Sequence, residues 1–64
     1  MAMLEYVKTI LQKVSFNKHL FERELIKGIR YLMPTEIEEF KDWCYDSFGI
    51  SHRPILNRYF RSAY

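Results

Sequence analysis

The strongest candidates for chemistry in this chain are a single cysteine, Cys44, and two histidines, His19 and His52. A cysteine beside a histidine is the arrangement of a thiol nucleophile with its general base. Cys44, however, falls on the apolar side of a predicted helix, where a free cysteine behaves as a small hydrophobic residue. We therefore expect Cys44 to pack in the core and not to react.

The same three residues would be single metal ligands on three different elements. Structural zinc sites take paired ligands at short spacing, and the sequence contains no such pair. It also lacks the phosphate-binding motifs G-x-G-x-x-G and G-x-x-x-x-G-K-[ST] and the catalytic motifs H-E-x-x-H and G-x-S-x-G. We expect no enzymatic activity, no cofactor and no metal.

Two groups of charged residues are the better candidates for function. Carboxylates recur at Glu38, Asp42 and Asp46, and a spacing of four places them on one helix face. The C-terminal segment 51–64 interleaves arginines with aromatic residues, a mixture that is enriched in protein interfaces and that also binds phosphates and stacks on bases. The predicted interaction surface therefore consists of Arg53, Arg58, Tyr59, Arg61, Tyr64, Glu38, Asp42 and Asp46.

The charge distribution allows this surface to work within one chain or between two. The net charge is +2, but residues 1–33 carry +3, residues 34–46 carry −4 and residues 47–64 carry +3. Such blocks can pair when the C-terminal segment folds back on the acidic helix, or when two copies meet. The sequence leaves both arrangements open.

Length and aromatic content favour a partner. The 64 residues form one small domain, and a domain of this size buries only about 60% of its unfolded surface. Eleven aromatic residues are difficult to bury in so small a core. We expect some of them to face a second copy or another protein.

Apolar spacing predicts an all-α fold, a compact array of about four short helices, and few Gly and Pro residues argue against strands. The expected helices are 3–14, 18–32, 36–47 and 52–61. Their apolar stripes predict core contacts through Leu4, Val7, Leu11, Phe21, Leu25, Ile29, Phe40, Cys44 and Phe48.

Local signals predict the helix ends. Asn17 is the expected N-cap of the second helix, with Phe16 and Phe21 as a hydrophobic staple across it. Thr35 and Glu38 fit a capping box for the third helix, which Gly49 should end. Ser51 is the expected cap of the last helix. Gly28 lies inside the second helix, where it would allow another helix to approach closely.

Residues 41–60 resemble the helix-turn-helix of bacterial regulators. Gly49 matches the turn glycine, Ile50 the apolar residue after it and Ile55 a buried position of the second helix. Tyr45, Pro54 and Arg58 depart from that pattern. The resemblance implies a DNA-binding module in which these residues face the groove: Ser51, His52, Arg53 and Asn57.

The whole chain also resembles short bacterial all-helical proteins that begin like Met3-Leu4-Glu5-Tyr6 and carry a segment like Asp42-Trp43-Cys44-Tyr45. That resemblance implies a compact helical domain. The first residues contain no basic and apolar leader, so we expect a cytoplasmic protein. The apolar stripe of the helix 3–14 is more typical of a packed core than of a membrane surface, so we expect no membrane binding.

These observations favour a small, non-catalytic module that binds another protein or forms a homo-oligomer. The alternative is a DNA-binding module that uses the helix after Ser51. Nucleic acid is the less favoured partner, because a net charge of +2 is mild and the preceding helix is acidic.

Overall fold

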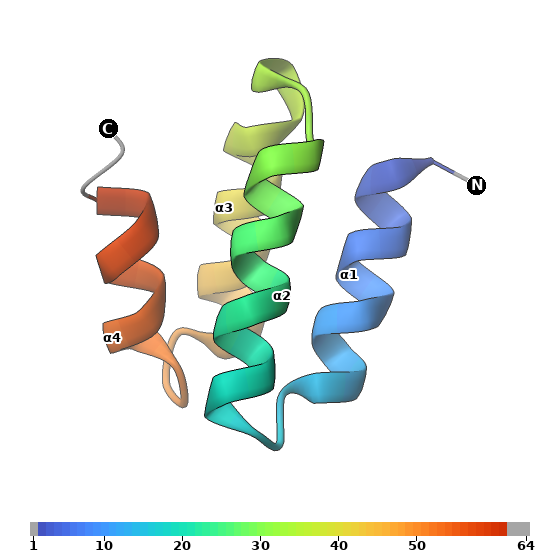
Figure 1. The fold of residues 1–64 in the computed structure, drawn as a ribbon. Coiled ribbons are helices and arrows are strands. Elements are labelled where there is room, and N and C mark those ends of the chain that lie inside the picture. The colour runs from blue at the N-terminus through green and yellow to red at the C-terminus, as the bar shows by residue number, and fades with distance from the viewer. Residues whose placement is uncertain (1, 62–64) are drawn as a thin grey trace.

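The computed structural model describes residues 2–61 and shows an all-α fold, as the sequence predicts (Figure 1). Its elements are α1 (Met3–Val14), α2 (Lys18–Tyr31), α3 (Pro34–Phe48) and α4 (Arg53–Leu56), which continues into the π-helical turn η1 (Asn57–Arg61). The bounds of α1 agree with the prediction. The single expected helix 52–61 instead changes from α to π geometry at Asn57.

The boundary between α2 and α3 differs from the prediction. Leu32 has an extended backbone, so α2 ends one residue early, at Tyr31. Helix α3 begins at Pro34, two residues before the expected start, because the first turn of a helix needs no N–H from proline. It ends at Phe48, one residue later than predicted.

Two of the predicted helix caps are therefore wrong. Thr35 lies inside α3, and the N-cap residue is Met33, whose N–H donates to Glu36 Oε1 at 2.9 Å. The carboxylate of the capping box thus belongs to Glu36 and not to Glu38. His52, not Ser51, is the N-cap residue of α4, and it makes no side-chain cap bond.

The start of α2 agrees only in part with its prediction. Asn17 is the N-cap, and its Oδ1 accepts from the Leu20 N–H at 3.1 Å. The predicted staple is wrong, because Phe16 remains 80% exposed while Phe21 is fully buried. The Phe21 ring packs on Phe48 and His52 instead.

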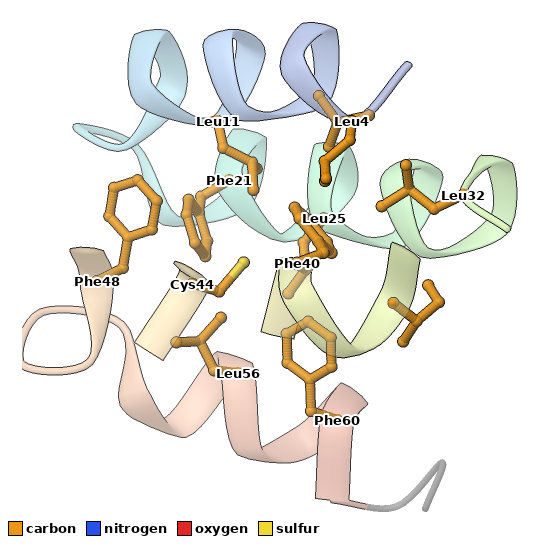
Figure 2. Packing of buried hydrophobic residues seen from close by; sticks show 12 residues of the cluster. Leu4, Leu11, Phe21, Leu25, Leu32, Phe40, Cys44, Phe48, Leu56 and Phe60 are labelled. Atoms are coloured by element: carbon orange, nitrogen blue, oxygen red, sulfur yellow. The ribbon is translucent and has the colours of Figure 1, made fainter. Parts of the chain in front are cut away.

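The helices pack around α2. In Figure 1, α1 and α4 lie on either side of α2, and α3 lies behind it. Figure 2 shows side chains from all of these helices meeting between them. Most of the predicted core is confirmed, although Ile29 is only half-buried. The buried hydrophobic residues are Leu4, Val7, Leu11, Phe21, Leu25, Leu32, Ile37, Phe40, Cys44, Phe48, Leu56 and Phe60.

The two glycines are places of close approach, not of unusual backbone conformation. A Cβ on Gly28 would lie 2.6 Å from Val7 Cγ1, so the missing side chain lets α1 pack closely on α2, as predicted. Gly49 follows α3 with right-handed backbone angles, and the Tyr45 carbonyl oxygen occupies the space that a Cβ would need. Neither glycine has a positive φ.

Candidate interaction surface

The C-terminal segment, for which the sequence leaves contacts within the chain and contacts with a partner both open, binds Glu22 on α2 of its own chain. Tyr59 Oη donates to Glu22 Oε2 at 2.5 Å, and Arg58 Nη1 donates to the same oxygen at 3.0 Å. These three side chains, the Glu22 cluster, join η1 to α2 across 36 or 37 positions of sequence. Two residues of the predicted interaction surface therefore make contacts within the molecule.

The Glu22 cluster changes the acidity of its members. The hydrogen bond from Tyr59 lowers the pKa of the Glu22 carboxyl below its ordinary value of 4.5, and the Arg58 charge acts in the same direction. The same hydrogen bond raises the pKa of the Tyr59 hydroxyl above 10.0, because the phenol must keep its proton to donate. The cluster is therefore most favourable with Glu22 ionised and Tyr59 neutral.

The rest of the predicted surface is dispersed. Arg53 Nε donates to the Gly49 carbonyl at 3.1 Å within the turn, and Arg61 is exposed on η1. Glu38, Asp42 and Asp46 are exposed along α3, while Tyr64 lies outside the described residues. The described acidic residues of this surface thus lie on α3, and the basic ones lie on α4 and η1.

Of the four residues expected to face a DNA groove, two are not exposed. His52 is only 5% exposed, so its placement in the groove is wrong for this conformation. Asn57 is half-buried, and its Oδ1 accepts from Tyr45 Oη at 2.6 Å. Ser51 and Arg53 are exposed.

His52 has a structural role that its sequence position does not reveal. Its ring stacks on Phe21 with a centroid distance of 4.2 Å, and Nε2 lies 2.8 Å from the Ser15 carbonyl oxygen. Because a carbonyl oxygen only accepts, Nε2 carries the proton and donates. Nδ1 is buried without a hydrogen-bond partner. His52 thereby joins the α3–α4 turn to the α1–α2 turn.

Cys44 is fully buried on α3, as the sequence predicts. Burial raises the pKa of its thiol from 9.0 to about 12, because the apolar core cannot solvate a thiolate. The thiol therefore remains protonated at neutral pH. Its surroundings are those of a packing residue.

The surface feature that sequence reasoning missed is a groove between α1 and α2, with a volume of about 190 Å³. Tyr6 and Tyr31 border it with 52% and 66% of their surfaces exposed, and Met3 is 44% exposed. Gly28 forms its floor together with Val7. The groove is lined by Met3, Tyr6, Val7, Ile10, Glu24, Lys27, Gly28 and Tyr31.

A signal for this groove was present in the sequence. Met3, Tyr6 and Ile10 are spaced i, i+3 and i+7, which makes a second apolar line beside the buried line of Leu4, Val7 and Leu11. The apolar arc of α1 is thus wider than one contact with the core requires. A helix with a wide apolar arc has side chains left over for a further contact.

Three further large apolar residues are exposed at the ends of the helices. Phe16 and Ile50 lie in the two turns that His52 joins, and Met33 lies between α2 and α3. None of the three lines the groove.

Other kinds of site were sought in the same structure. In residues 2–61, no three His, Cys, Asp or Glu side chains gather where they could bind a metal ion. None of the helices described is long and apolar enough to cross a membrane. Comparisons with known proteins found no matching family model, no matching curated protein and no matching solved structure.

Proposed function

We propose that this chain is a non-catalytic helical module that binds protein chains, including further copies of itself. The observation that carries this proposal is the α1–α2 groove, where Met3, Tyr6 and Tyr31 remain exposed although twelve other hydrophobic residues within 2–61 are buried. Tyrosine and methionine are frequent in interface cores, where they supply contact area without charge.

The size of the groove fits this use. An apolar cavity of about 150 Å³ binds one benzene molecule. The groove volume of about 190 Å³ therefore accommodates one aromatic or branched side chain of a partner. Two flanking tyrosines would exclude water from that contact, as residues around an interface anchor do.

The experiment is sedimentation equilibrium over a concentration series, with the wild-type chain and the double variant Tyr6→Ser/Tyr31→Ser. We expect the wild-type chain to associate and the double variant to remain monomeric. Phe16→Ser is the matched control, because Phe16 is an exposed aromatic residue outside the groove. A wild-type chain that stays monomeric, or a double variant that associates equally, would contradict the proposal.

The alternative function, DNA binding by the helix after Ser51, has less support. Of its four proposed contact residues, His52 is buried and Asn57 is bound to Tyr45. Filter binding to random duplex DNA at about 50 mM salt tests it, because phosphate contacts are strongest at low salt. No binding under that condition would exclude the alternative.

A further inference from the structure

We propose that copies of this chain associate head to tail, with an acidic stripe on α3 of one copy docked on a basic stripe on α2 of the next. The acidic stripe consists of Glu38, Asp42 and Asp46, and the basic stripe consists of Arg23, Lys27 and Arg30. This inference rests on the proposed function, because it names the partner as a second copy and specifies how the copies meet.

The basic stripe is a continuous exposed face of α2. Arg23, Lys27 and Arg30 are spaced i, i+4 and i+7, and all three are exposed. Lys27 also borders the α1–α2 groove, so a chain docked on the stripe would cover the edge of the groove as well.

Of the two acids of α2, one is paired outside the basic stripe and the other is paired with a residue of the stripe. Glu22 accepts hydrogen bonds from Tyr59 and Arg58. Glu24 pairs with Lys27, with its Oε2 3.4 Å from Nζ. Only one of the three stripe cations is thus partly neutralised by an acid of its own helix.

The acidic stripe matches the basic stripe in length. Glu38, Asp42 and Asp46 are exposed at i, i+4 and i+8 on α3. At a rise of 1.5 Å per residue, the acidic stripe extends about 12 Å and the basic stripe about 10.5 Å. Two helices laid side by side can therefore pair all three positions.

The two stripes lie on opposite sides of the molecule. Phe21 on α2 and Phe48 on α3 meet in the core with a ring-centroid distance of 5.0 Å, and α3 lies behind α2 in Figure 1. At about 100° per residue, the basic stripe lies about 140–160° around α2 from buried Leu25, and the acidic stripe lies about 120–160° around α3 from buried Cys44, so each stripe points away from this shared core. A two-fold dimer cannot use both contacts between the same two copies. The contact is therefore heterologous, and it leaves one unused stripe at each end of an assembly.

The test uses one triple variant for each stripe. Glu38→Gln/Asp42→Asn/Asp46→Asn removes the acidic charges, and Arg23→Gln/Lys27→Gln/Arg30→Gln removes the basic charges. All six positions are exposed, so circular dichroism spectra and melting temperatures should stay close to those of the wild-type chain. Sedimentation is measured for each variant alone and for an equimolar mixture.

The expected results follow from the geometry. The wild-type chain should form dimers and larger species that grow with concentration, and each variant alone should associate at least about tenfold more weakly. The mixture should form a one-to-one dimer and nothing larger, because only one complementary pair of stripes remains. Raising salt from about 0.01 M to about 1 M should dissociate the wild-type assembly, since the screening length falls from about 30 Å to about 3 Å.

Three results would overturn the inference. The wild-type chain could stop at a dimer, the mixture could form larger species, or each variant could associate as strongly as the wild-type chain. In each case association itself persists, so the proposed function stands while the head-to-tail contact is rejected. A wild-type chain that never associates would reject both.

Discussion

The two sides of α2 differ in how they are covered. Toward η1, the Glu22 cluster joins the helices, and Leu56 and Phe60 are buried against the core. Toward α1, Gly28 admits Val7 at close range, yet Tyr6 and Tyr31 stay exposed beside a groove. The side of α2 toward η1, the closed side, is covered by hydrogen bonds and packing. The side toward α1, the open side, leaves the groove exposed.

This difference shows that aromatic content alone does not identify which aromatic residues stay exposed. The aromatic residues of the C-terminal segment are used for folding: Phe60 packs edge-on against Phe40 with a centroid distance of 5.9 Å, and Tyr59 binds Glu22. The tyrosines of α1 and α2 have no comparable internal role, and it is these that the proposed function uses.

The largest loss of stability is expected from a substitution on the closed side of α2. Phe60→Ala removes a ring that is only 1% exposed, and emptying such a site typically costs about 3–5 kcal/mol. At about 0.05–0.15 kcal/mol per residue, a chain of 64 residues has a total stability of about 3–10 kcal/mol, so the variant should lose a large part of it and melt at a much lower temperature. Thermal melting followed by circular dichroism measures this.

Labelling of Cys44 with a thiol reagent checks the same variant independently. A thiol pKa of about 12 against 9.0 lowers the thiolate fraction at neutral pH about a thousandfold in the folded chain. Phe60→Ala should make labelling fast. A melting temperature and a labelling rate equal to those of the wild-type chain would show that η1 is dispensable.

The second prediction concerns the floor of the groove. Gly28→Ala places a Cβ 2.6 Å from Val7 Cγ1, and overpacking of this kind costs about 1–3 kcal/mol. The gain in helix propensity is about 1 kcal/mol, so we expect the free energy of unfolding, measured in urea, to fall by about 1 kcal/mol.

A double variant separates the clash from other effects. Val7→Ala removes the atom that the new Cβ would meet. Gly28→Ala/Val7→Ala should therefore lose less stability than the sum of the two single variants. Strict additivity would mean that the two side chains do not compete for the same space.

The third prediction concerns the hydrogen bonds of the closed side. Tyr59→Phe removes the donor that lowers the pKa of Glu22, so that pKa should rise toward 4.5, as carboxyl NMR titration can measure. The variant should melt at a lower temperature than the wild-type chain at neutral pH.

The pH dependence has a definite sign. Because the pKa of Glu22 is lowered in the folded chain, its contribution to stability is present above pH 4.5 and is lost as the pH falls through the folded value. The difference in melting temperature between wild type and Tyr59→Phe should thus shrink in acid. A difference that grows in acid would contradict the assignment of the pKa change to Tyr59.

The smallest change in stability is expected from a substitution on the open side of α2. Tyr31→Ser changes a side chain that is 66% exposed, so the free energy of unfolding measured in urea should change by no more than about 0.5 kcal/mol. A loss above about 1 kcal/mol would show that Tyr31 supports the fold, and the contrast between the two sides would disappear.

Local signals in the sequence predicted most of the fold. The apolar spacing of α1 gave its exact bounds, and Asn17 caps α2 as expected. The start of α3 was predicted two residues late, because the proline that ends one helix also begins the next at N1. The exact first residue of a helix depends on the local backbone conformation, and several residue types can adopt that conformation equally well.

The internal contacts of the candidate residues could not be predicted, because they join distant parts of the chain. Tyr59 meets Glu22 across 37 positions, and His52 meets Ser15 across 37 positions. Periodicity within one helix cannot show that such a residue is already occupied. The groove likewise forms only when α1 and α2 are packed together.

The hydrogen bond between His52 and the Ser15 carbonyl has a consequence for how this chain can change during evolution. Its acceptor is a main-chain atom, so residue 15 can be replaced by most other residues without loss of the bond. An inserted or deleted residue between Val14 and Lys18 would instead move the carbonyl away from the ring. Natural variation should therefore alter the identity of residues in this turn while conserving their number.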